Sequence, residues 1–117
     1  MNILAHRGYW KKPDEKNTLI AVQRAFTHGY GIETDVRDYE KKLVISHNVA
    51  DRHCHLFEDA LHIYQELGCM SFLAINIKSD GIQDMLEELL HKYNIRNYFV
   101  FDMSIPEQVV YRAKKIN

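Results

Sequence analysis

The chain has 117 residues, with 15 Lys and Arg, 16 Asp and Glu, and a formal net charge of −1. This length predicts one domain over residues 1–117. The balanced charge gives no electrostatic case for binding nucleic acid. No apolar run approaches the roughly 20 residues that span a bilayer, so we expect no membrane span. Cys54 and Cys69 are too few for a disulfide framework. They predict reduced thiols in a cytoplasmic protein.

Strand and helix patterns alternate along the chain. The expected strands cover residues 2–5, 31–36 with an extension over 43–46, 72–78 and 98–102. The expected helices lie between Thr18 and Gly29, over 56–67, over 81–93, and from Ser104 through Ile116. Asn17 or Thr18 is expected to cap the first helix. Asp80 with Gln83, and Ser104 with Glu107, match the capping-box pattern at the starts of the last two helices.

The alternating order predicts an α/β fold with a parallel sheet and right-handed crossovers. About four such units could form a small doubly wound sheet. They could also form half of an eight-fold barrel, which typically needs about 250 residues.

Polar side chains gather where the expected strands end. In parallel α/β folds the active site forms at these carboxyl ends. Glu33 and Asp35 are two residues apart and therefore project from the same face of a strand. Two adjacent carboxylates indicate a bound cation or a shared proton. The candidate site residues are His6, Arg7, Glu33, Asp35, His47, Asn76, Lys78 and Asp102. Acids that hold a metal, cations that contact phosphate and two histidines suit phosphodiester cleavage.

Five blocks of the sequence resemble the glycerophosphodiester phosphodiesterase family in order and spacing. They are His6-Arg7-Gly8, Asn17-Thr18, Gly-Ile-Glu-Thr-Asp-Val at 31–36, Val-Ile-Ser-His at 44–47 and Ile-Asn-Ile-Lys at 75–78. The resemblance implies a (β/α)8 barrel that hydrolyses a glycerophosphodiester to an alcohol and a glycerol phosphate with a divalent cation, Mg²⁺ or Ca²⁺. It also implies roles for the matching residues: His6 and His47 as the acid–base pair, Arg7 and Lys78 at the phosphate, and Glu33 and Asp35 as metal ligands.

Four features depart from the family pattern. Lys16 and Asn48 stand where the family usually has carboxylates, and Asn76 stands where it has a glutamate that binds the metal. An amide oxygen can still bind a hard cation, but it brings one negative charge less. Asp102 could compensate if its strand is in phase with Asn76, on a face shared with Tyr98 and Val100. The chain also stops after about four units, near the end of half a barrel.

Other interpretations stay open at this point. The departures also fit an impaired module that binds phosphate or a partner chain without catalysis. A half barrel would expose Phe72, Ala74, Tyr98 and Val100, so we expect a homo-oligomer, a second chain or the remainder of a longer barrel to cover them. The loop with Asp51 and His53-Cys54-His55 lacks the four spaced ligands of a zinc site. A nucleotide-binding domain is disfavoured because no Gly-rich loop follows the first strand.

Overall fold

The computed structural model describes residues 3–114, without the side chain of Ile105. Six strands form one sheet: β1 (Leu4–His6), β2 (Gly31–Tyr39), β3 (Lys42–Ile45), β4 (His55–Leu56), β5 (Leu73–Ile77) and β6 (Tyr98–Phe101). The helices are the short 3₁₀ turn η1 (Pro13–Glu15) and α1 (Leu19–Thr27), α2 (Phe57–Glu66), α3 (Gln83–Lys92) and α4 (Ile105–Ala113). Asn2 and Ile116, which the sequence assigns to the first strand and the last helix, lie outside the described residues.

Four strands are parallel neighbours in the order β1, β2, β5 and β6. This arrangement confirms the parallel part of the prediction. The extension expected over residues 43–46 is instead an antiparallel hairpin strand, β3, on the second half of β2, and β4 continues antiparallel to β3. The sheet is therefore mixed, and the expectation of a wholly parallel sheet is wrong for this segment. Glu40 and Lys41 form the two-residue hairpin turn, both with positive φ (49° and 65°).

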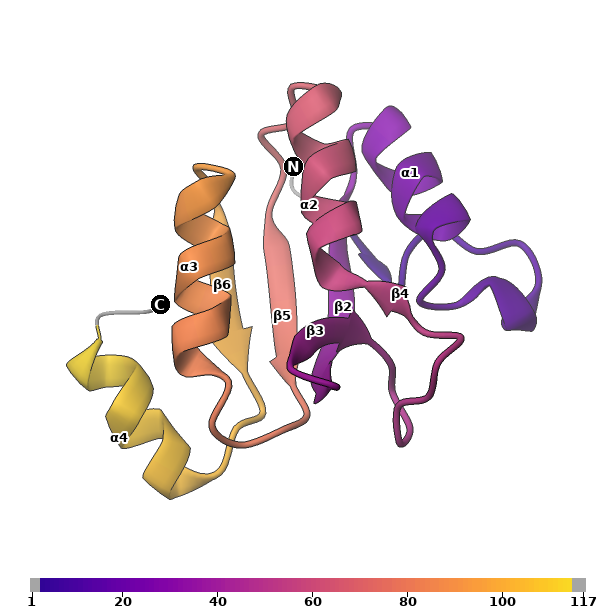
Figure 1. Cartoon of the computed structure of the whole chain (residues 1–117). Helices are drawn as coiled ribbons and strands as arrows, with labels where there is room; N and C mark the ends of the chain where they lie inside the picture. Colours follow the sequence, from indigo (N-terminus) through magenta and orange to yellow (C-terminus); the bar gives the residue numbers. More distant parts are fainter. Residues whose placement is uncertain (1–2, 115–117) are drawn as a thin grey trace.

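Helices α1, α2 and α3 lie side by side along one side of the sheet, and α4 lies near the lower end of α3 (Figure 1). Their apolar faces, which include Leu86 of α3, bury a common core with the strand residues that point the same way, among them Ile32 of β2 and Ile75 of β5. The Thr18 hydroxyl caps α1 by accepting the N–H of Ala21, and Ser104 caps α4 by accepting the N–H of Glu107. The Thr18 cap is as predicted, but only the Ser104 half of the capping box predicted with Glu107 is present, because the Glu107 carboxylate accepts from Gly81 N–H and Gln83 instead.

The capping box predicted at Asp80 and Gln83 is wrong. Helix α3 has Ile82 at its N-cap, without a side-chain cap. Gln83 itself is buried and donates its amide N–H to the Glu107 carboxylate, which joins α3 to α4. The Gln83 side chain therefore makes a tertiary hydrogen bond to Glu107 in place of the local capping contact that the sequence pattern predicts.

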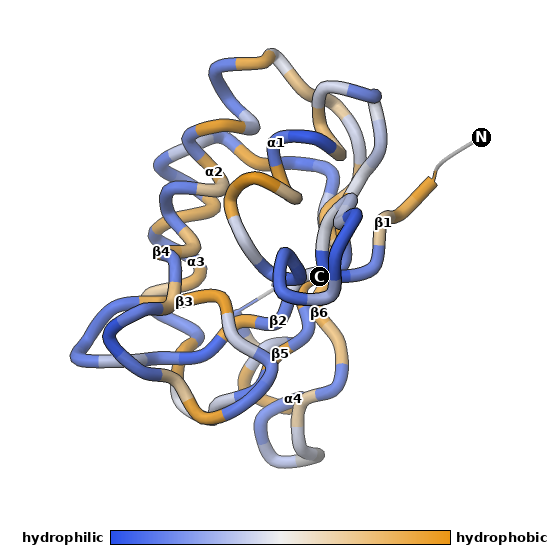
Figure 2. Tube along the Cα trace, turned by 90° about the vertical axis from the view of Figure 1, so that its right-hand side faces the viewer, coloured by the Kyte–Doolittle hydropathy of each residue, from blue (hydrophilic) through white to orange (hydrophobic). Residues whose placement is uncertain are grey.

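The other face of the sheet is only partly covered. Figure 2 shows α2 and α3 on the left and the apolar strand β1 on the right, away from them. On this second face Leu4, Phe72 and Phe99 are 40%, 36% and 39% exposed. The register pairs Val100 with Ile75 and Phe101 with Asn76. Tyr98 and Val100 consequently pack against the core, and Ala74 is buried. Of the four side chains that we expected to be exposed, only Phe72 is exposed.

Candidate functional site

The predicted residues meet at the carboxyl ends of β1 and β5, next to Glu33 and Asp35 in the first half and the middle of the longer strand β2 (Gly31–Tyr39). The register places His6 beside Glu33, and Asp35 beside Asn76. His47 follows β3 closely and reaches the same place, because β3 runs back along β2. Within residues 3–114 no helix has the length and apolar character needed to cross a membrane.

Asp35 is the centre of this group and is only 1% exposed. Its Oδ2 accepts a hydrogen bond of 2.9 Å from Asn17 Nδ2. Arg7 Nε lies 3.3 Å and His47 Nδ1 lies 3.6 Å from the same oxygen. A buried carboxylate is stable only when partners compensate for its lost hydration. Asp35 therefore fixes the Asn17 and Arg7 side chains directly, and it lies close to His47, which Arg7 contacts through Nη2.

Glu33 lies beside this centre in a different environment. Burial, followed by the nearby Asp35 charge, raises the pKa of Glu33 above its ordinary value of 4.5, and His6, Asn76 and Arg7 only partly oppose this shift. Its Oε1 accepts a 3.3 Å hydrogen bond from Asn76 Nδ2. Its Oε2 lies 3.4 Å from His6 Nε2 but has no hydrogen-bond partner. The Asn76 Oδ1 atom is buried without a partner as well.

These unsatisfied oxygens are what a hard cation would bind. Carboxylate and amide oxygens are the usual ligands of Mg²⁺ and Ca²⁺. No group of three Asp, Glu, His or Cys side chains within residues 3–114 could hold a metal ion. A cation held here would thus depend on the two carboxylates of β2 together with the amide oxygen of Asn76. The residues fit the kind of ion expected, with a ligand charge of about −2 from Glu33 and Asp35.

The turn after β1 positions Arg7. Arg7 has a φ of 58° and Gly8 a φ of 87°, a region that costs glycine little. The Arg7 N–H donates to the Glu33 carbonyl at 2.8 Å, which ties the turn to β2. A Cβ on Gly8 would lie 2.8 Å from the Ala21 Cβ, so glycine also allows α1 to approach.

Arg7 also selects the tautomer of the neutral His47 ring. Its Nη2 lies 2.9 Å from His47 Nδ1. A guanidinium can only donate hydrogen bonds, so Nδ1 is the acceptor and the proton of the neutral imidazole is on Nε2. The half-exposed ring of His47 therefore presents an N–H donor away from Arg7.

Two contributors were not among the sequence candidates. Asn17 was expected only as a possible helix cap, but its side chain donates to Asp35. Arg37 donates to the His47 carbonyl at 2.7 Å and to the Lys78 carbonyl at 3.3 Å, and so holds two site segments together. Arg37 could have been found, because it follows Asp35 by two residues and shares its face of β2.

Asp102 does not follow the arrangement predicted for it. The phase assumed for β6 is wrong, since Val100 shares its face with Ile75 rather than with Asn76. Asp102 comes just after β6 with a φ of 69°, and its carboxylate pairs with Lys78 Nζ at 3.2 Å. It therefore neutralises the lysine expected at the phosphate instead of completing the set around Glu33.

The raised pKa of Glu33 predicts how stability depends on pH without a divalent cation. The folded chain binds this proton more tightly than the unfolded chain, so the stabilisation is complete below pH 4.5 and is lost as pH rises through the higher folded value. Glu33→Gln removes this loss. We expect the free energy of unfolding of Glu33→Gln, relative to the parent, to increase between pH 4 and pH 7 in urea titrations with chelator. A difference that is the same at both pH values would contradict the prediction.

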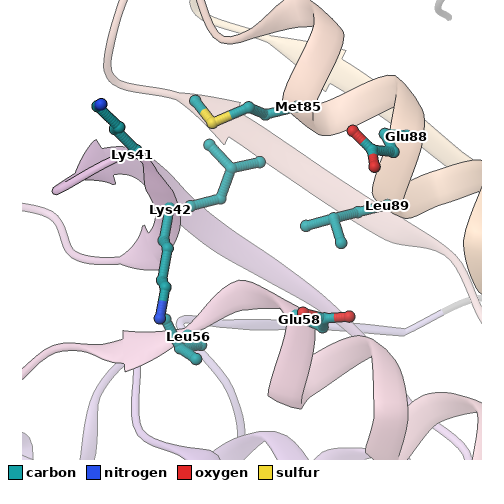
Figure 3. A pocket seen from close by; sticks show the side chains of 8 residues that line it. Lys41, Lys42, Leu56, Glu58, Met85, Glu88 and Leu89 are labelled. Atoms are coloured by element: carbon teal, nitrogen blue, oxygen red, sulfur yellow. The ribbon is translucent and has the colours of Figure 1, made fainter.

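Two hollows lie in the surface near the hairpin. One, of about 370 Å³, adjoins the site and is lined by Arg7, Asn17 and His47 on its inner side. The other, of about 220 Å³, lies between the hairpin and helices α2 and α3 (Figure 3). There Met85 and Leu89 of α3 face Lys41, Lys42 and Leu56 across the hollow. The second hollow contains none of the candidate site residues.

The fold and site together define an α/β protein with an acid–histidine centre at the strand ends, similar to a TIM-barrel enzyme. No family model matches the sequence, and no curated protein matches it. Among solved structures, it is similar to a glycerophosphodiester phosphodiesterase from Agrobacterium tumefaciens, with a TM-score of 0.78 and 18% sequence identity. The match covers 100% of this chain and 65% of that enzyme. The likeness shows the fold and agrees with a partial barrel of this kind.

Proposed function

We propose that this chain carries the active centre of a metal-dependent phosphodiesterase that hydrolyses glycerophosphodiesters to an alcohol and a glycerol phosphate. The observation that carries the proposal is the meeting of His6, Glu33, Asp35 and His47 around buried oxygens that have no hydrogen-bond partner. The structural likeness to a phosphodiesterase of this kind supports the same reaction.

The two histidines would move the protons of this reaction. His47 directs Nε2 away from Arg7. In its imidazolium form, with the Nδ1 proton turned from Arg7 toward Asp35 Oδ2, which lies 3.6 Å away, it would give the Nε2 proton to the departing alcohol oxygen and become the neutral ring. His6 is 67% exposed at its side chain and has Glu33 beside Nε2. It would accept a proton from the attacking water. Glu33 would then stabilise the charged form of the His6 ring.

Arg7 would contact the phosphate, and Lys78 would do so once its contact with Asp102 opens. Both cations stabilise the negative charge that develops on the phosphoryl oxygens. A Mg²⁺ or Ca²⁺ ion held by Glu33, Asp35 and Asn76 would supply further charge neutralisation when bound. Arg7 keeps its place at the phosphate because Asp35 holds its Nε.

A second candidate function is a phosphate-binding module without catalysis. The observation that favours it is that the described charges already pair with one another, Asp35 with Arg7 and Asp102 with Lys78. A phosphate could replace either carboxylate as partner without any hydrolysis. Turnover of a glycerophosphodiester separates the two functions.

Asn76→Glu tests the proposed metal set. The variant restores a third carboxylate, so we expect the concentration of Ca²⁺ or Mg²⁺ needed for half-maximal hydrolysis to fall by about tenfold or more, since charge count sets affinity in such sites. In chelator the variant should be less stable than the parent, because three carboxylates then repel. Asn76→Gln is the matched neutral control and should show neither effect. An unchanged cation requirement in Asn76→Glu would exclude Asn76 from the site.

We also infer that the apolar second face is covered in the assembled protein, by a second copy of the chain or by further β/α units. Leu4, Phe72 and Phe99 are each more than a third exposed on it. Burying such side chains contributes about 25 cal/mol per Å². A monomer in light scattering at micromolar concentration would exclude the second copy.

A further inference from the structure

The 370 Å³ cavity beside the site is lined in part by polar and charged side chains that have no role in the proposed reaction. On its inner side Arg7, Asn17 and His47 join it to the reacting centre. On its outer side it is lined by Lys16 of the loop before α1, His53 of the loop before β4, and His55, the first residue of β4. Its volume is at the lower end of the range for small-molecule pockets, which leaves ample room for one ester arm.

Two cations, Arg7 and Lys16, line this cavity. Asp51 is the only carboxylate among the residues that line it. The Asp51 Oδ1 atom is already engaged, because it accepts the His53 backbone N–H at 2.8 Å and lies 3.7 Å from Cys54 Sγ. Lys16, in contrast, forms no ion pair with a carboxylate of residues 3–114, and its Nζ lies 4.6 Å from the centre of the Trp10 ring.

The loop that carries Lys16 is firmly anchored. Glu15 accepts the Lys11 N–H at 2.8 Å and pairs with Arg24 Nη1 of α1 at 3.0 Å. The Arg24 hydrogen bond, followed by that of Lys11, lowers the pKa of Glu15 to about 2. The Asn17 N–H closes the loop on the Arg7 carbonyl at 2.8 Å. Lys16 therefore lies between two fixed points, one of which is the phosphate-contacting turn itself.

We propose that this cavity binds an anionic group, a carboxylate or phosphate, on the alcohol arm of the substrate, with Lys16 as the residue that determines specificity. The inference rests on the proposed function. Because glycerol carries only hydroxyl groups, the anion must be on the departing alcohol. His53 and His55 supply additional N–H donors at the outer side of the cavity, where this anionic group would lie.

The test compares diesters of glycerol phosphate with alcohols of similar size. The arms are ethanediol (neutral), choline (cationic), and glycolate and phosphoethanediol (both anionic). We expect kcat/KM of the parent to be about tenfold higher for an anionic arm than for choline, as one charged hydrogen bond allows. The better of the two anionic arms distinguishes carboxylate from phosphate. Lys16→Glu should reverse the order of anionic and cationic arms, whereas Lys11→Glu, an equal charge change on an exposed residue of the same loop, should keep it.

The result separates this inference from the proposed function. Equal turnover of all four diesters by the parent, or the same order in Lys16→Glu, overturns the cavity assignment and leaves the hydrolase intact. No turnover of any diester overturns the hydrolase. In that case calorimetric binding of the same four diesters decides the inference. Tighter binding of an anionic arm that is lost in Lys16→Glu supports it, and equal binding overturns it.

Discussion

Asp35→Ala should lose about 3 kcal/mol of folding free energy, the lower end of the cost of breaking a buried ion pair. The carboxylate is 1% exposed, and its removal leaves Arg7, whose side chain is only 22% exposed, without a counter-charge. The loss is at the lower end because Arg7 keeps some contact with water and Glu33 loses a repulsive neighbour. Such a loss is a large share of the stability of a small domain. Chemical denaturation at pH 7 measures it.

Asp38→Ala is the matched control, because Asp38 lies three residues further along β2 with an exposed side chain. It should change stability by less than about 0.5 kcal/mol. Asp35→Asn should keep the Asn17 contact but lose the charge that holds Arg7, and so lie between parent and Asp35→Ala. Equal stability of Asp35→Ala and Asp38→Ala would show that Asp35 does not hold the site together.

His6→Ala and His47→Ala should each lower kcat for a glycerophosphodiester by about 10²- to 10⁴-fold, the usual contribution of a positioned acid or base. Both side chains are well exposed, 67% and 45%, so folding stability should change little. The pH–rate profile of the parent should have an acid and a basic limb, and each variant should lose one of them. The experiment is steady-state hydrolysis across pH 5–9.

His91→Ala is the control for both variants, because His91 is an exposed residue of α3. Its rate should equal that of the parent. If His6→Ala and His47→Ala also kept the parent rate, the acid–base assignment would be wrong even though hydrolysis occurred.

Much of this site could be predicted because strand periodicity fixes directions. Glu33 and Asp35 share a face in any strand, and polar side chains at the ends of parallel strands must meet. His6 and Arg7 end β1, and the register indeed brings His6 beside Glu33. The helix positions could be predicted equally well, since apolar spacing and the Thr18 and Ser104 caps are local features of the sequence.

The errors concern properties that local sequence does not contain. The hairpin turn has Glu40-Lys41 rather than the Asn-Gly that favours such turns, so β3 was expected only as an extension of β2. Which residues of β6 share a face with Asn76 depends on the register of β6 against β5, and the alternation of side chains does not determine this register. The prediction for Asp102 was wrong for this reason. Gln83 does not cap α3 as expected, because its side chain forms a hydrogen bond with Glu107, a residue that is distant in sequence but close in the folded chain.

The central claim is that this centre hydrolyses a phosphodiester with the help of a cation held at Glu33, Asp35 and Asn76. The most direct measurement is release of glycerol phosphate from a simple glycerophosphodiester by the purified 117-residue chain. The assay is run in Ca²⁺, in Mg²⁺ and in excess chelator, with His6→Ala beside it. We expect turnover that requires the cation, is abolished by chelator and is restored when the cation is returned. Turnover that is equal with cation and with chelator, or equal in the parent and His6→Ala, would contradict it.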